Sequence, residues 1–126
     1  MNAQLRESLY DLWEMGGCEL AMQRTSGVKR ELLLDLEMSG LDPKYHDIIR
    51  FHAVNRWDEN DEFFEYARPR HRLCEEAEKI TGITNEQLEN CRPSDIVMDD
   101  FRAFIDGAEL VGDDLGFDVR FLTVEI

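Results

Sequence analysis

The sequence predicts one α/β domain with a mixed β-sheet, in which a three-stranded antiparallel meander is joined by one parallel strand and flanked by helices. Three segments rich in apolar and β-branched residues follow one another between residues 31 and 67, separated by polar turns. A helical pattern and another short apolar segment come later, and this order implies a crossover to a parallel strand. At 126 residues the chain is long enough for one core and too short for two ordinary domains.

Residues 1–30 are expected to form a helical N-terminal extension, and residues 31–126 are expected to form the domain itself. Four apolar side chains of the extension recur at the spacing of one helix face: Leu5, Leu9, Leu12 and Trp13. Two glycines at positions 16 and 17 end this helix. The helix either packs on the outside of the domain or docks a partner, and the sequence leaves both interpretations open.

The first predicted strand is the apolar run 32–34, which is followed by Asp35 and Glu37. Side chains alternate across a strand, so these two carboxylates point to the same face. Two like charges at this spacing repel by on the order of a few kcal/mol at intermediate dielectric. Burying the pair beside an apolar strand therefore requires a cation. The stretch predicts a divalent-metal site.

The next two strands complete the meander. Residues 47–55 (DIIRFHAVN) form the second strand, residues 58–61 are expected to turn the chain, and residues 62–67 (EFFEYA) form the third strand. Residues 68–72 (RPRHR) are the one dense basic patch, and the proline places them in a loop. This patch either decorates the surface or contacts a phosphate group.

Helices dominate the second half of the chain. Short helices are expected at 73–80 and 85–90, and a longer one starts at Pro93 and Ser94 and ends at Gly107. Residues 109–111 form a short buried strand, and a last helix starts at Asp113 or Asp114. Phe117, Phe121 and Leu122 of that helix are expected to face the core.

Asp114 and Asp118 share one face of the last helix because they are four positions apart. Asp118 lies among apolar residues, so it is a candidate for the third carboxylate of the metal site. The alternative is an exposed acidic residue on an amphipathic helix. The helical spacing alone does not separate the two interpretations.

The charge balance excludes one class of function. Lysine and arginine total 14 against 28 aspartate and glutamate, a net charge of −14, which argues against binding along a long stretch of duplex and against acidic membranes. A substrate held by metal ions and a local basic patch remains compatible with this charge. The three cysteines have no zinc-site spacing, and no signal peptide or membrane span is recognisable, so a cytoplasmic protein is expected.

Several segments in order resemble the DEDD-type 3′-to-5′ exonuclease superfamily, which includes the proofreading exonucleases of DNA polymerase III and oligoribonuclease. The similar segments are DLEMSGL at 35–41, FFEYARPRHRL at 63–73, ITGIT at 80–84 and FDVRFL at 117–122. The resemblance covers about residues 31–124 and implies a ribonuclease H-like fold. It also implies hydrolysis of phosphodiester bonds at the 3′ ends of single-stranded DNA or RNA by a two-metal mechanism.

The resemblance assigns roles to individual residues. Catalysis and the binding of Mg²⁺ or Mn²⁺ would fall to three carboxylates: Asp35, Glu37 and Asp118. Asp114 is a further candidate metal ligand. Three residues of the first motif would contact the terminal nucleotide: Met38, Ser39 and Leu41. Expected partners are the nucleic-acid 3′ end and a second copy of the chain or a polymerase-associated protein.

The sequence also departs from the pattern of this superfamily. The third motif, which supplies a histidine or tyrosine base and a fourth carboxylate, is absent, so the domain is expected to be C-terminally truncated and its activity is doubtful. Arg50 lies where relatives often carry glutamate, and His52 lies where they often carry glycine. The alternative to an exonuclease is a catalytically inactive interaction module, or a fragment of a larger exonuclease or polymerase subunit.

Overall fold

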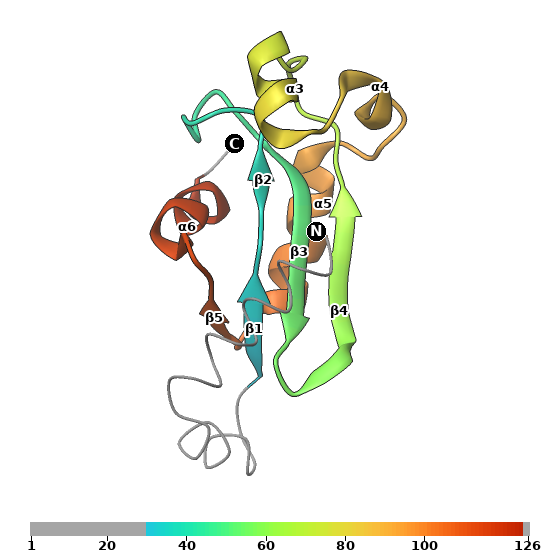
Figure 1. Ribbon diagram of the computed structural model, residues 1–126. Coiled ribbons are helices and arrows are strands. Elements are labelled where there is room, and N and C mark those ends of the chain that lie inside the picture. The colour runs from blue at the N-terminus through green and yellow to red at the C-terminus, as the bar shows by residue number, and fades with distance from the viewer. Residues whose placement is uncertain (1–29, 125–126) are drawn as a thin grey trace.

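A computed structural model describes residues 30–124, so the helix expected near the N-terminus lies outside the described residues. The strands are β1 (Glu31–Leu34), β2 (Glu37–Met38), β3 (Ile48–Asn55), β4 (Asp58–Tyr66) and β5 (Glu109–Val111). The helices are α3 (Glu75–Thr81), α4 (Asn85–Leu88), α5 (Ser94–Ile105) and α6 (Leu115–Thr123). In Figure 1, α5 lies behind the sheet and α3 and α4 lie beyond one end of it.

The five strands form one mixed sheet. β3 pairs antiparallel with β1, β2 and β4, and β1 also pairs parallel with β5. Leu33 lies opposite Val54 of β3 on one side and beside Val111 of β5 on the other. The antiparallel meander and the added parallel strand are therefore confirmed. The predicted first strand is interrupted between β1 and β2, and β5 is half-buried where the sequence predicted a buried strand.

The turn predicted at residues 58–61 was wrong, because these residues already belong to β4. The hairpin turn lies at Arg56 and Trp57, where the Asn55 side-chain oxygen accepts a hydrogen bond from the Trp57 backbone N–H at 3.0 Å. Asp61 accepts two hydrogen bonds of 2.8 Å from the Arg30 guanidinium. The acidic residues suggested a loop, but they are tolerated on this strand because their side chains are exposed or paired.

The helices start and end with local capping interactions. α3 begins two residues later than predicted, because Cys74 is its N-cap and accepts from the Ala77 N–H at 3.4 Å. Gly82 ends this helix with a left-handed backbone (φ 72°). At α5, the Ser94 hydroxyl donates to the Ile48 carbonyl at 2.7 Å, which ties the start of that helix to β3.

The main core lies between the sheet, α5 and α6. Its centre is aromatic: the Phe101 ring lies 5.2 Å from the Phe51 ring and 5.1 Å from the Phe63 ring, measured between centroids. Phe121 and Leu122 of α6 are buried in the same cluster, as predicted, whereas Phe117 is only half-buried. This packing holds α6 on the sheet and so determines where its first turn lies.

Arg102 of α5 joins that helix to the end of α6. Its guanidinium donates to the Leu122 carbonyl through Nε at 3.0 Å and through Nη2 at 2.7 Å, and to the Val124 carbonyl at 3.1 Å. These carbonyls belong to the last turn, which carries partial negative charge. Among residues 30–124, no helix is both long enough and apolar enough to cross a membrane.

Candidate active site

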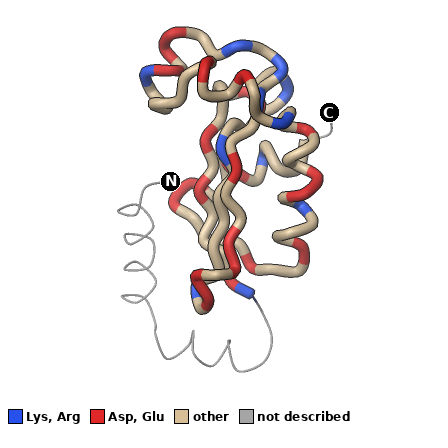
Figure 2. Tube along the Cα trace, turned by 90° about the vertical axis from the view of Figure 1, so that its right-hand side faces the viewer, with Lys and Arg blue, Asp and Glu red and all other residues tan. Residues whose placement is uncertain are grey.

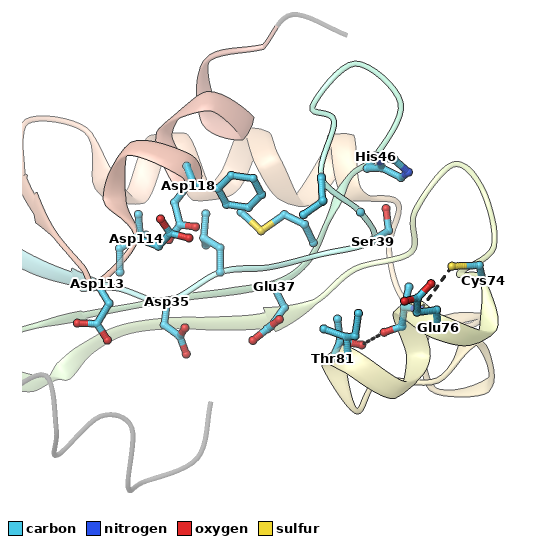
Figure 3. Close-up of a pocket in the computed structure, with 18 residues that line it drawn as sticks. Asp35, Glu37, Ser39, His46, Cys74, Glu76, Thr81, Asp113, Asp114 and Asp118 are labelled. Carbon is cyan, nitrogen blue, oxygen red and sulfur yellow. Dashed lines mark hydrogen bonds between the residues drawn. The ribbon is translucent and has the colours of Figure 1, made fainter.

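One cavity of about 650 Å³ brings the predicted site residues together. Its walls come from the end of β1, from β2 and the loop after it, from α3, and from the first turn of α6. All of the predicted residues line it: Asp35, Glu37, Met38, Ser39, Leu41, Asp114 and Asp118. In Figure 3 the carboxylates gather at one end of this cavity, and the α3 residues Glu76 and Thr81 lie at the other.

Asp35 and Glu37 occupy the break between β1 and β2. The Asp35 backbone N–H donates to the His52 carbonyl at 2.9 Å, and Glu37 lies opposite Arg50 in the pairing of β2 with β3. These contacts set the alternation of side chains through the break. Both carboxylates therefore point to the same side of the sheet, as the sequence predicted (Figure 3).

Arg50 binds both of these carboxylates, a contact that the sequence reasoning missed. Its Nη2 lies 3.0 Å from Asp35 Oδ2 and 3.3 Å from Glu37 Oε1. Burial raises the pKa of Asp35 and of Glu37 above the ordinary values, and the guanidinium opposes both rises. Two sequence signals pointed to this residue: a charged side chain in a largely apolar strand, and an arginine where relatives often carry glutamate.

Asp118 lies on the first turn of α6 and is only 6% exposed. Burial raises its pKa to about 7, and the negative charges of Asp114, Asp35 and Glu37 add to the effect. The Asp118 N–H donates to the Asp114 carbonyl at 3.0 Å, which confirms that the two residues share a helical turn. The interpretation of Asp118 as an exposed surface acid is wrong, because α6 packs this face against the sheet.

The carboxylates fit a hard divalent cation in donor type and charge. Mg²⁺ and Mn²⁺ prefer oxygen ligands, and the side chains at this end of the cavity supply five carboxylates: Asp35, Glu37, Asp113, Asp114 and Asp118. Burial is the main cause of the raised pKa of Asp118, and repulsion from Asp114, Asp35 and Glu37 adds to it. Within residues 30–124, however, no group of three or more acidic, histidine or cysteine side chains is close enough to share one ion.

The three predicted nucleotide contacts differ in their exposure. Met38 is buried in the main core, and Ser39 is half-buried. Ser39 fixes the start of the loop at 39–47, because its N–H donates to the Asp47 carbonyl at 2.8 Å and its hydroxyl accepts from the Asp47 N–H at 3.0 Å. Leu41 is 78% exposed at the cavity edge. Of the three side chains, Leu41 is the most accessible to a ligand.

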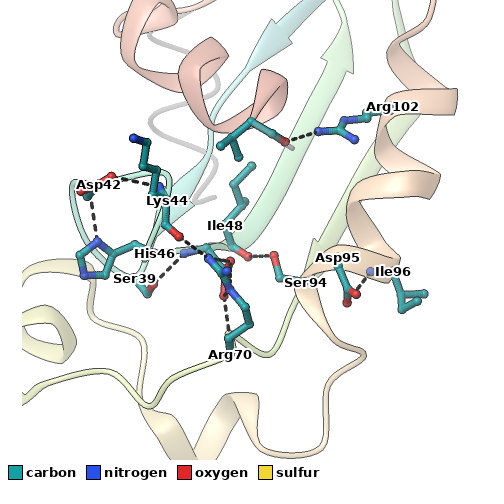
Figure 4. Close-up of polar contacts among 12 residues, drawn as sticks. Ser39, Asp42, Lys44, His46, Ile48, Arg70, Ser94, Asp95, Ile96 and Arg102 are labelled. Atoms are coloured by element: carbon teal, nitrogen blue, oxygen red, sulfur yellow. Dashed lines mark hydrogen bonds and ion pairs between the residues drawn. The ribbon is translucent and has the colours of Figure 1, made fainter. Parts of the chain in front are cut away.

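The basic patch at 68–72 helps to hold the loop at 39–47 in place. Arg70 donates its backbone N–H to Asp47 Oδ2 at 2.7 Å and pairs its guanidinium with Asp47 Oδ1 at 3.0 Å (Figure 4). Arg70 also donates to the Lys44 carbonyl at 3.2 Å. Figure 2 shows several basic residues at the end of the molecule that carries α3. Arg70 thus has a structural role, and a phosphate contact by the patch stays a prediction.

The far wall of the cavity is α3, which the sequence did not assign to the site. Ile80 lines the cavity and is 77% exposed, and Ala77, one turn earlier, and the adjacent Thr81 also line it. No residue of this helix is buried in the core, and only the tertiary placement of the helix shows that Ile80 belongs to the cavity. A largely exposed apolar side chain at the wall of a cavity is typical of a residue that contacts a ligand.

Comparison with known proteins agrees with this fold. A family model described as exonuclease matches residues 32–126, a range that includes every candidate site residue. The chain belongs to the exonuclease family. The mixed sheet and its flanking helices are the ribonuclease H-like fold that the motifs implied.

Relatives of this exonuclease-family chain include subunits of DNA polymerase III. It is 36% identical over 97 residues to the PolC-type DNA polymerase III of Thermotoga petrophila, covering 75% of the chain and 7% of that protein. It is 35% identical over 101 residues to the DNA polymerase III subunit epsilon of Rickettsia conorii, covering 77% of the chain and 44% of that protein. The chain thus spans less than half the length of each of these relatives.

A solved structure supports the same fold. Escherichia coli exonuclease I in complex with a dT13 oligonucleotide superimposes with a TM-score of 0.63 at 17% identity, covering 75% of this chain and 22% of that one. At this level of identity the likeness concerns the arrangement of the sheet and helices.

Proposed function

We propose that the chain hydrolyses phosphodiester bonds at the 3′ ends of single-stranded DNA or RNA and releases nucleotides one at a time. The observation that carries this proposal is the composition of the cavity beside Asp35 and Asp118, which joins an acidic end to an apolar edge. A terminal nucleotide has the matching parts, because its phosphodiester needs cations beside carboxylates and its base needs an apolar surface.

The apolar part of the cavity suits a nucleobase. Leu41 and Ile80, from the loop after β2 and from α3, both line the cavity and are largely exposed. A flat base placed against them would remove their side chains from water, and such packing tolerates any base. In the sequence, Met38 and Ser39 lie between Glu37 and Leu41. They would contact the sugar of the terminal nucleotide, partly through backbone groups.

The acidic part would hold the metal ions. Asp35, Glu37 and Asp118, with Asp114 beside them, are the proposed ligands of two Mg²⁺ or Mn²⁺ ions. Such ions activate water and stabilise the charge of the leaving oxygen when they are bound. The protein contributes the orientation of its carboxylates: β1 and β2 fix Asp35 and Glu37, and the packing of α6 fixes Asp118.

The proposal predicts a ladder of shortened products from a 5′-labelled single-stranded oligonucleotide incubated with Mg²⁺ or Mn²⁺. Asp35→Asn and Asp118→Asn should each lower the rate by about a hundredfold or more, because each removes a charged ligand. Asp99→Asn is the matched control, since Asp99 is exposed on α5 and away from the cavity. An oligonucleotide with a blocked 3′ end should stay intact.

Absence of shortened products at micromolar protein with either ion would refute the exonuclease activity. The remaining explanation would then be the inactive interaction module, which the pairing of Arg50 with Asp35 and Glu37 favours. A polymerase subunit is the partner suggested by the relatives, which are DNA polymerase III proteins. Single-stranded DNA is the substrate suggested by the solved exonuclease I complex with dT13.

A further inference from the structure

Arg50 presents its guanidinium to the two strand carboxylates that the proposed function gives to a metal ion. A single nitrogen, Nη2, contacts one oxygen of Asp35 at 3.0 Å and one oxygen of Glu37 at 3.3 Å. We propose that Arg50 is an internal counter-cation that competes with divalent metal ions for Asp35 and Glu37. The inference rests on the proposed function in taking these carboxylates as metal ligands.

The position of Arg50 in the sheet makes this contact a property of the fold. Arg50 lies opposite Glu37 where β2 pairs with β3, so both side chains leave the sheet on the same face. Its side chain is 12% exposed, and the strand on which it sits is otherwise buried. The guanidinium is therefore delivered to the carboxylates by strand register rather than by a flexible surface loop.

The remaining contacts of Arg50 point to the same role. Its Nε is buried and has no hydrogen-bond partner among the described residues, so the two carboxylates are its main binding partners. No lysine or arginine occurs among the described residues that line the cavity. Arg50, which does not itself line the cavity, thus supplies the positive charge next to the Asp35 and Glu37 carboxylates. The guanidinium group of arginine is always charged in proteins.

Competition follows from the shared oxygens. A carboxylate lone pair directed at an N–H is not available to a cation at the same point, and a positive charge next to the pair repels a second one. A divalent ion that binds Asp35 and Glu37 must therefore displace the guanidinium or bind beside it against this repulsion. Removing the charge of Arg50 should strengthen metal binding.

The test is the affinity for Mn²⁺, measured by titration calorimetry or electron paramagnetic resonance without nucleic acid. Arg50→Gln should bind Mn²⁺ at least about tenfold more tightly than the wild type, because one nearby positive charge is removed. Arg92→Gln is the matched control. It removes the same charge from a guanidinium paired with Glu65 and Asp100 on the surface, and it should change the affinity by less than about twofold.

Two further variants locate the effect. Arg50→Lys keeps the charge and should bind Mn²⁺ as weakly as the wild type; if it binds as tightly as Arg50→Gln, the charge is not the cause and the proposal fails. Combining Asp35→Asn with Arg50→Gln should abolish the gain. An unchanged affinity in folded Arg50→Gln, with folding checked by circular dichroism, would also overturn the proposal.

A measurement on the wild type covers the case in which Arg50→Gln does not fold. The side-chain Nε–H signal of Arg50, assigned by its loss in Arg50→Lys, should shift as Mg²⁺ saturates the protein. A signal that stays unchanged while Mg²⁺ binds would contradict competition. If Arg50→Gln gains Mn²⁺ affinity but releases no nucleotides, the inference about Arg50 stands and the exonuclease function fails. If nucleotides are released but Arg50→Gln gains no Mn²⁺ affinity, the exonuclease function stands and the inference about Arg50 fails.

Discussion

Replacing Asp118 by asparagine should make the metal-free protein more stable at pH 8. In the wild type, burial and the charges of Asp114, Asp35 and Glu37 raise the Asp118 pKa from 3.8 to about 7. At pH 8 the folded protein must therefore carry a buried anion that repels its neighbours, whereas the unfolded chain carries the same anion in water. Asparagine has a similar shape and no charge, so it removes this cost.

The sign and size of the effect follow from proton binding. Between pH 3.8 and about 7 the folded state holds a proton on Asp118 that the unfolded state has lost, so stability falls as pH rises through this window. At about 1.4 kcal/mol per pH unit, the rise in pKa corresponds to about 4 kcal/mol. Water at the cavity mouth screens part of the repulsion, so we expect about 2 kcal/mol.

Thermal unfolding in EDTA, followed by circular dichroism from pH 5 to pH 8, measures this difference. The melting temperature of Asp118→Asn should exceed that of the wild type by about 5–10 °C at pH 8 and should approach it near pH 5. Asp99→Asn, on the exposed face of α5, should follow the wild-type curve. Equal melting temperatures at pH 8, or a difference that does not shrink as pH falls, would refute the electrostatic account of Asp118.

Three further predictions concern stability, each measured by urea unfolding. Gly112→Ala should destabilise the protein by about 1–3 kcal/mol, because a Cβ there would lie 2.8 Å from the Leu34 carbonyl oxygen. Gly116→Ala on α6 places its Cβ with no atom within 4 Å and should stabilise the protein by up to about 1 kcal/mol. Equal effects of the two substitutions would contradict this reasoning. Phe101→Ala should cost about 3–5 kcal/mol, since the ring fills the aromatic core, and a cost below about 1 kcal/mol would be inconsistent with that packing. Thr84→Ala should cost about 1 kcal/mol by removing the capping box of α4, a loss that an unchanged midpoint would disprove.

The sheet could be predicted because its signals are local. The apolar run at 32–34 and the β-branched and aromatic residues at 48–54 indicate buried strands, and the spacing of Asp35 and Glu37 indicates one shared face. The start of β4 could not be predicted in this way. Its acidic residues have the composition of a turn, and only the pairing of Asp61 with Arg30, which lies 31 positions earlier, shows why they extend the strand.

The sequence predicted the carboxylates of the candidate site, but it did not predict the residues that contact them or form the opposite wall of the cavity. Asp35, Glu37 and Asp118 carry recognisable motifs, and they do line one cavity. Arg50 was not linked to them, because its contact depends on the register between β2 and β3, which no local pattern specifies. Ile80 reaches the same cavity only through the placement of α3, which depends on tertiary packing.

The Arg102 guanidinium influences the acidic end of the cavity from outside it, because it is bound to the end of the helix that carries Asp118. It donates to the Leu122 carbonyl, and Asp118 lies one helical turn earlier on the same helix. We expect a substitution of Arg102 to loosen the packing of α6 on α5 and so to change the position of the Asp118 carboxylate relative to Asp35 and Glu37. Substitutions outside the cavity would then change the pKa of Asp118 although every residue that lines the cavity stays the same.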